Sequence, residues 1–416
     1  MRTSAPSVRV WIEKHSHRTA FGFSSPFVCA GSQASLSGTT QAGRLSDVPF
    51  SILENVMRGK KRLAFYGLLA LMLAPLAPAQ LYTVSDLGTL GGSSSVGMGV
   101  NDFGQVVGES STVSGLSTHA FLWTKGKRMH DLGTLGGSTS QAFAINDLDQ
   151  VVGLSTTTGD LTTHAFLWTK AKGMHDLGTL GGCYSQAEAI NFFGHVVGGS
   201  ITAGCDFSEF HAFLWTKANG MEDLGTLGSP YSEATAINSF GQVVGISAID
   251  NFTAYHAFLW TKTDGIQDLG TLGGCFSSAD AINDLGQVIG ESTTSCDSSP
   301  SEDPFLWTKT EGMQDLGPPP GVFGGLSAIN IFGEVVGTFC LQPCSGVEHA
   351  FIWTKETGWL DLNNLIPKHS GWVLTVPYDI NVWGQVSGYG LINGEAHAFL
   401  LTPTRRRTRR THVLQR

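Results

Sequence analysis

The chain has 416 residues, of which 53 are glycine and only 14% are charged, a composition typical of short strands joined by tight turns rather than of helices. Residues 80–403 hold 10 Lys and Arg against 31 Asp and Glu, a net charge of 10 − 31 = −21. A surface this acidic repels phosphate backbones and anionic lipid, so the composition excludes nucleic-acid binding by this segment.

The N-terminal part has the pattern of an export signal. Residues 57–79 begin with a basic stretch, continue with the apolar run from Leu63 to Leu76 and end in Ala77-Pro78-Ala79. These are the parts of a secretory signal peptide, and the alternative interpretation is a membrane anchor. We therefore expect residues 1–56 to be a disordered leader or an over-extended start, and the mature chain to be extracellular without a stable membrane span.

The segment 80–403 is a sevenfold repeat of about 45 residues. Three motifs recur in fixed order, and each gives a set of seven positions. Asp-Leu-Gly begins at Asp86, Asp131, Asp176, Asp223, Asp268 and Asp315, with the variant Asp361-Leu362-Asn363. An Asn followed three residues later by Gly, or once by Asp149, occurs at Asn101, Asn146, Asn191, Asn238, Asn283, Asn330 and Asn381. His-Ala-Phe begins at His119, His164, His211, His256, His349 and His397, and is replaced once by Asp303-Pro304-Phe305.

Each repeat contains four short strands, a to d. Strand a ends at the Asn, strand b follows the Gly, strand c contains His-Ala-Phe-Leu-Trp, and strand d leads into Asp-Leu-Gly. The Asn can hold the a–b turn with its side chain, while the Gly, or Asp149, supplies a positive φ. Four antiparallel strands in about 45 residues make one β-propeller blade.

The ends of the array predict how the ring closes. The array opens with a lone d strand, residues 81–87, and it stops after the seventh c strand at Thr402. A first strand that completes the last blade removes the exposed sheet edges that an open stack would leave. We therefore predict an all-β, seven-bladed propeller of four-stranded blades, closed by its N-terminal strand, with strand a innermost and without capping units.

Six cysteines follow the signal peptide, and an even number in an exported chain indicates disulfides. Cys183 and Cys205 occupy the same two places in their repeat as Cys275 and Cys296 do in theirs. Both places lie on the face formed by the d–a and b–c links, so we predict the pairs Cys183–Cys205 and Cys275–Cys296, and the local pair Cys340–Cys344. The alternative, a zinc site, lacks histidines at metal-type spacing.

The motif set resembles that of the bacterial extracellular repeat proteins called the HAF family, over Leu81 to Pro403. The carrying motifs are His-Ala-Phe, Asp-Leu-Gly-Thr-Leu-Gly-Gly and Ile-Asn-x-x-Gly-Gln-Val-Val-Gly. The resemblance implies secretion and a repeat fold, and it implies no catalytic residue. Members often end in a sorting or anchoring segment, whereas residues 404–416 of this chain form an Arg-rich stretch that we interpret as a disordered basic tail.

The repeated His, Asp and Asn are interpreted as structural, because seven equivalent positions on seven blades cannot converge on one catalytic or metal site. We predict no catalytic, metal or cofactor residue, and no enzymatic activity. Function is expected where the repeats differ. The candidates are Phe207, Phe252, Tyr255 and Asp297 in the b–c loops, and Glu188 and Asp280 between the two alanines of strand a, facing the channel.

Three functions are compatible with these residues. The first is a monomeric binding module at the cell surface, with a glycan or a protein as its partner. The second is a structural component of the cell envelope. The third, a carbohydrate-active enzyme, is supported by analogy with other propellers alone.

Overall fold

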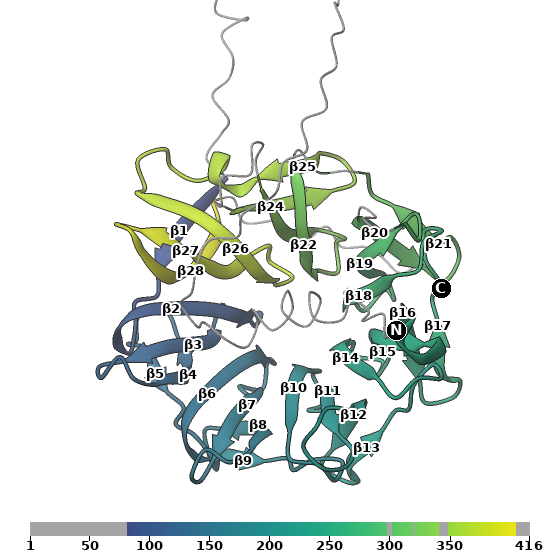
Figure 1. Ribbon diagram of the computed structural model, residues 1–416. Helices are drawn as coiled ribbons and strands as arrows, with labels where there is room; N and C mark the ends of the chain where they lie inside the picture. Colours follow the sequence, from purple (N-terminus) through teal and green to yellow (C-terminus); the bar gives the residue numbers. More distant parts are fainter. Residues whose placement is uncertain (1–80, 298–301, 318, 320, 341–347, 405–416) are drawn as a thin grey trace, which may run out of the picture. The chain divides into compact units, whose positions relative to one another are not determined.

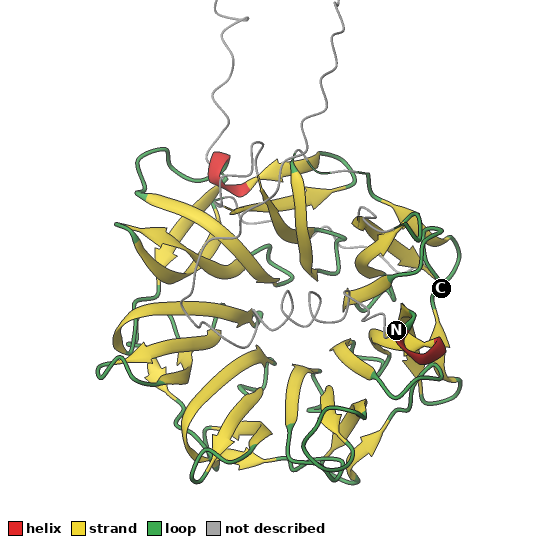
Figure 2. Cartoon of the chain, in the orientation of Figure 1, coloured by secondary structure: helices red, strands yellow, loops and turns green. Residues whose placement is uncertain are grey.

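The structure is a computed structural model that describes residues 81–297, 302–317, 319, 321–340 and 348–404. The predicted leader 1–56 and signal peptide 57–79 lie outside the described residues, and so does the tail from residue 405. The described residues form seven four-stranded antiparallel sheets arranged in a ring (Figure 1). The only helices among them are two short 3₁₀ turns (Figure 2). The predicted seven-bladed propeller is confirmed.

The blades follow one another in chain order, each with strands a, b, c and d. Blade 1 comprises β2 (Gly91–Val100), β3 (Val106–Thr112), β4 (Thr118–Trp123) and β5 (His130–Asp131). Blade 2 comprises β6 (Gly136–Ile145), β7 (Val151–Thr157), β8 (Thr163–Thr169) and β9 (Gly173–Asp176). Blade 3 comprises β10 (Ser185–Ile190), β11 (Val196–Ile201), β12 (Phe210–Thr216) and β13 (Gly220–Asp223). Blade 4 comprises β14 (Ser232–Ile237), β15 (Val243–Ile249), η2 (Asp250–Phe252), β16 (Ala254–Thr261) and β17 (Gly265–Asp268).

The remaining blades keep this order until the ring closes. Blade 5 comprises β18 (Ser277–Ile282), β19 (Val288–Thr293), β20 (Glu302–Thr308) and β21 (Gly312–Asp315). Blade 6 comprises β22 (Val322–Ile329), β23 (Val335–Cys340), β24 (Glu348–Thr354) and β25 (Gly358–Asp361), followed by η3 (Leu362–Asn364). Blade 7 comprises β26 (Trp372–Ile380), β27 (Val386–Ile392) and β28 (Glu395–Pro403), and its fourth strand is β1 (Tyr82–Asp86).

Successive strands of a blade are antiparallel, so its four connections alternate between the two ends of the ring. We call the end with the d–a links and b–c loops the loop face, and the end with the a–b and c–d turns the turn face. The phenylalanines of strand c are fully buried in clusters that join adjacent blades, as in the cluster that contains Phe166 of blade 2 with Val107 and Ala120 of blade 1. Each such ring contributes about 1.5–3 kcal/mol by leaving water.

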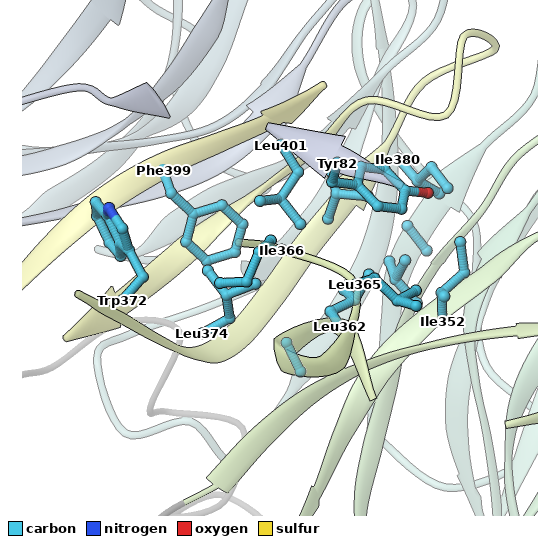
Figure 3. Close-up of a cluster of buried hydrophobic side chains, with 14 residues drawn as sticks. Tyr82, Ile352, Leu362, Leu365, Ile366, Trp372, Leu374, Ile380, Phe399 and Leu401 are labelled. Atoms are coloured by element: carbon cyan, nitrogen blue, oxygen red, sulfur yellow. The ribbon is translucent and has the colours of Figure 1, made fainter. Parts of the chain in front are cut away.

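The N-terminal strand closes the ring as predicted. β1 pairs with β28 from Tyr82 opposite Pro403 to Asp86 opposite Phe399. The Tyr82 side chain enters a core cluster with residues of η3, β26 and β28 (Figure 3). Asp86 also accepts a hydrogen bond from His397 Nδ1 at 3.0 Å, so strand pairing, apolar packing and a side-chain contact all join the two ends of the array.

A belt of asparagine side chains links all seven blades. The Nδ2 of each motif Asn donates to the backbone carbonyl of the equivalent Asn in the next blade, from Asn101 to Asn146 and round to Asn381, which donates to Asn101 at 2.9 Å. The Oδ1 of each Asn accepts the N–H groups two and four residues on, which closes the a–b turn, as in Asn146 with Leu148 and Gln150. The sequence predicted the turn but not the belt.

The motif histidines are structural, as expected. In six blades of the described part, His Nδ1 at the start of strand c contacts the Asp at the end of strand d, at 2.8–3.0 Å. The same Asp accepts the N–H of the residue two positions on, as Asp176 does from Gly178. One residue type therefore ties strand d both to strand c and to the link that follows.

Blade 5 departs from this pattern at two neighbouring positions. Asp303 replaces the His and stands against Asp315, and burial together with the charge of Asp315 raises the pKa of Asp303. At five other blade boundaries the Ala N–H of strand c donates to a Ser on the next strand a. Here Pro304 has no N–H. Gly324, five residues before Ile329, takes the place that the acceptor Ser277 has five residues before Ile282. The donor and its acceptor are lost together.

The closure predicts that deleting residues 81–90 destabilises blade 7. Loss of β1 exposes Tyr82's partners and one edge of β28, so the melting temperature should fall by several degrees, as expected for a loss of a few kcal/mol. Amide exchange should rise first in β28. Deletion of residues 405–416 is the control and should change neither quantity. An unchanged melting temperature in the first deletion contradicts the closed ring.

Blade 5 predicts a stabilising substitution. Asp303→His should restore the contact to Asp315 found in the other blades and remove a like charge, raising the free energy of unfolding by roughly 0.5 kcal/mol. Asp303→Asn, which removes the charge without adding the pair, should give a smaller gain in chemical denaturation at pH 6. Equal gains for the two variants would assign the effect to charge removal alone.

Candidate functional site

Two disulfides fasten the loop face. Cys183–Cys205 joins the link before β10 to the loop between β11 and β12, with the Cα atoms 5.3 Å apart. Cys275–Cys296 does the same in blade 5, with the Cα atoms 5.1 Å apart. Both predicted pairs are confirmed. Cys340 ends β23, but Cys344 lies outside the described residues, so the pair Cys340–Cys344 stays a prediction.

A continuous row of aromatic rings crosses the loop face from blade 3 to blade 4. The distances that follow join ring centroids. Phe207 stacks on Phe210 at 5.8 Å, and Phe210 stacks on Tyr231 at 5.7 Å. Tyr231 contacts Tyr255 edge-on at 6.0 Å. Tyr184 packs against Phe207 at 5.2 Å. Phe252 continues the row from Tyr255 at 6.4 Å. We call these six side chains the aromatic row.

Two members of the row lie on strained backbone. Phe207 has φ 54° and Phe252 has φ 65°, a region that bulky residues rarely adopt. Strain of this kind is kept where the surroundings impose it, and it gathers at ligand sites. Phe207 is 55% exposed and lies two residues beyond Cys205, so the disulfide holds this ring over Tyr184, the neighbour of Cys183.

The hydroxyl groups of two tyrosines of the row belong to a hydrogen-bonded group with Gln186 and Glu233. The Tyr184 hydroxyl donates to Gln186 Oε1, Gln186 Nε2 donates to Glu233 Oε1 at 2.6 Å, and the Tyr231 hydroxyl donates to Glu233 Oε2 at 2.8 Å. Burial, followed by the negative charge of Glu233, raises the pKa of Tyr184 and Tyr231 well above the usual value. Both phenols are therefore protonated donors with fixed orientation at neutral pH.

Strand a carries a β-bulge in every blade of the described structure, at the position that lies between the two alanines in blades 2 to 5 and at its equivalent in the other blades. A bulge re-aims a side chain. Met98 and Phe143 occupy this position in blades 1 and 2 and pack with Tyr378 of blade 7 in one apolar cluster. The same position holds Glu188 in blade 3 and Asp280 in blade 5. The innermost strands thus form one apolar and one polar, acidic sector.

Glu109 is a buried carboxyl group on the neighbouring strand β3. Its side chain is 6% exposed, and Oε2 accepts a hydrogen bond from Gln141 Nε2 at 2.6 Å. Burial raises the pKa of Glu109 to about 7, against a smaller lowering by the Gln141 bond. Glu109 therefore changes its charge near neutral pH, unlike an ordinary glutamate.

The predicted candidates fall into two groups. Phe207, Phe252 and Tyr255 belong to the aromatic row, although Tyr255 lies in strand β16 and not in the b–c loop where it was predicted. The charge of Glu188 helps to raise the pKa of Tyr184 and Tyr231. Asp297 is exposed beside Cys296 in blade 5 and is not part of the aromatic row. Asp280 is buried at the bulge of β18, two blades from Glu188.

Sequence reasoning missed Tyr184, Gln186, Phe210, Tyr231 and Glu233. Tyr184 directly follows Cys183 and Phe210 directly precedes His211. The available signal was an aromatic residue next to a motif position in blades 3 and 4, which the search for variable loops did not consider.

Among the described residues there is no group of three or more His, Cys, Asp or Glu placed to hold a metal ion. Nor does that part of the chain contain a helix of the length and apolar character needed to cross a membrane.

The fold has relatives among solved structures, at low sequence identity. The β-propeller domain of the trilobed protease from Pyrococcus furiosus, described as having an open velcro topology, matches with a TM-score of 0.50 and 9% identity over 79% of this chain and 99% of that one. TolB from Acinetobacter baumannii matches at 0.40 and 10% identity, over 62% of this chain and 65% of that chain. Puromycin hydrolase matches at 0.47 and 13% identity, over 78% of this chain and 55% of that chain. No family model and no curated protein matches the sequence. The first of these likenesses supports the propeller fold alone.

Glu109 predicts a pH-dependent stability. The pKa of Glu109 in the folded state lies above its unfolded value of about 4.5, so the unfolded chain loses this proton at a lower pH than the folded chain does. The free energy of unfolding therefore falls as the pH rises from about 4.5 to 7. Glu109→Gln should remove this loss and be the more stable protein at pH 8, by up to about 3 kcal/mol. The difference should shrink toward pH 4 in urea denaturation. A constant difference across this range would contradict the assigned pKa.

Proposed function

We propose that this chain is a secreted or cell-surface repeat protein of the HAF type that binds a glycan through its loop face. The aromatic row carries the proposal. It brings Phe207 and Phe252 from the b–c connections together with Tyr255 from the start of β16, beside hydrogen-bonded phenol, amide and carboxylate groups, and the Phe207 ring is exposed. Apolar rings with a few fixed polar groups are the usual construction of a small-molecule or sugar site.

The chemistry of the platform favours a neutral or cationic glycan. Aromatic faces suit the apolar faces of pyranose rings, and the Gln186 and Glu233 side chains suit hydroxyl groups. The b–c loops contain acidic residues and, by sequence, no Lys or Arg. Sulfated or uronic-acid polymers would be repelled at this face. The disulfide Cys183–Cys205 supports the same function, because a preorganised loop loses less entropy on binding.

Binding is tested on an array of neutral, amino-sugar and acidic glycans. The purified chain should bind members of the first two classes, and Phe207→Ala should weaken that binding by about tenfold or more, since an aromatic ring that contacts the ligand directly contributes on the order of 2 kcal/mol. The melting temperature should be unchanged, because Phe207 is more than half exposed.

The matched control is Leu116→Ala, which removes an exposed apolar side chain from the b–c loop of blade 1. It should leave binding intact. An array without signal, or equal binding by the two variants, would refute the proposed site. Binding restricted to protein ligands would replace the glycan by a protein partner at the same loops.

A further inference from the structure

The turn face carries a ring of exposed apolar side chains that the proposed function does not use. In every blade of the described part, the residue two positions after the belt Asn is large and apolar, with 44–76% of its surface exposed. We call these seven residues the apolar ring. They are Phe103, Leu148, Phe193, Phe240, Leu285, Phe332 and Trp383.

The hydrogen bonds of the a–b turn do not require an apolar residue at this position, although Phe193 also packs against Phe192 and His195. The a–b turn is held by the side chain of the motif Asn and by the positive φ of the residue three positions later, as in Asn238 and Gly241. The position between them contributes its backbone N–H to the turn, while its side chain points to solvent. Ser, Asp or Asn would serve a turn equally well. One exposed Phe or Leu is ordinary, but seven at equivalent positions form a patch that marks an interaction surface.

The a–b turns that carry the apolar ring are also joined to one another around the propeller axis. Each belt Asn donates to the carbonyl of the next belt Asn, so the seven a–b turns are tied to one another at the same height around the axis. The apolar side chains leave each turn from the same position. A partner with a flat surface would therefore meet the seven a–b turns together.

Basic residues surround this ring. Nine of the 10 Lys and Arg between residues 80 and 403 lie in the c–d turns of the same face, outside the ring. Five of them belong to blades 1 and 2, and they are exposed: Lys125, Lys127, Arg128, Lys170 and Lys172. The c–d turns contain only three acidic residues, Asp264, Glu311 and Glu356.

The a–b turns contribute acidic residues, most of which bind backbone. The carboxylate of Asp102 accepts the N–H of Val382, that of Asp147 accepts the N–H of Asp102, and that of Asp284 accepts the N–H of Ser239. Asp149 occupies the Gly position of its turn, with φ 57°. The charge of −21 that predicts repulsion of anionic lipid is thus unevenly placed, with the Lys and Arg concentrated on the turn face.

We propose that the turn face docks on a lipid surface, with the apolar ring entering the headgroup boundary and the c–d turns of blades 1 and 2 contacting anionic headgroups. Phe, Trp and Leu flanked by Lys and Arg are the residues that peripheral proteins place at a bilayer interface. A second copy of the chain fits less well, because stacked turn faces would bring basic turns to the same radius with few acidic partners.

Docking is measured by cosedimentation of the purified full chain with vesicles of phosphatidylcholine, with and without phosphatidylglycerol. The chain should bind both and prefer the anionic vesicles. The variant Phe103→Ser/Phe193→Ser/Phe240→Ser should bind at least about tenfold more weakly to each, with an unchanged melting temperature because all three rings are mostly exposed.

Two controls separate the ring from general hydrophobicity and general charge. Val113→Ser/Leu116→Ser/Leu161→Ser removes apolar residues of the loop face that are even more exposed and should bind vesicles like the parent. Lys125→Ser/Lys127→Ser should lose the preference for phosphatidylglycerol. Lys368→Ser, which changes the one Lys or Arg of residues 80–403 outside the c–d turns, should keep it. Absence of vesicle binding by the parent, or equal binding by the ring variant, overturns the proposal. Conversion of a dimer to a monomer by the ring variant also overturns it, in favour of a second copy.

Discussion

The asparagine belt is the interaction on which the ring depends. Each belt Asn is 3–6% exposed, and its Oδ1 receives two backbone donors of its own turn while Nδ2 reaches the next blade. A buried amide that satisfies its hydrogen-bonding groups contributes stability, whereas one that loses a partner costs about 1–3 kcal/mol. Aspartate in its place would accept from the turn and donate nothing. The belt therefore makes each turn and each blade boundary depend on the same side chain.

This coupling leaves the loop face free to vary. The belt, the buried Phe of strand c and the His–Asp pairs hold the blades without any contribution from the b–c loops, which differ in length and sequence. Blade 5 illustrates the tolerance, since it lacks both the His–Asp pair and the Ala–Ser bond and still forms its four-stranded sheet. In blades 3 and 5 the disulfides then fix individual loops on a frame that does not need them. Because the rest of the blade is held independently, such a frame tolerates the backbone strain of residues such as Phe207.

The fold was predictable because its determinants are local and repeated. A lone d strand before the first blade and a missing one after Thr402 were sufficient to predict that the first strand completes the last blade, as β1 does by pairing with β28. Paired cysteine positions predicted two disulfides for the same reason. The site was only partly predictable: Phe207, Phe252 and Tyr255 are variable and aromatic, but their contact through Phe210 and Tyr231 depends on the distance between adjacent blades. The spacing of residues within one repeat does not predict the distance between two adjacent blades.

The apolar ring is a case in which the assumption that function lies only where the repeats differ fails. Seeking function where repeats differ assigns every recurrent feature to structure, and this holds for the Asn, the His and the Gly because each has a bond or a φ that requires it. The residue after Asp102 or Ser239 is recurrent in character and has no such requirement. A repeated residue is structural only if the structure uses its side chain. In a closed ring, a planar binding surface can itself be built from sevenfold repetition, because a planar partner needs no single converging site.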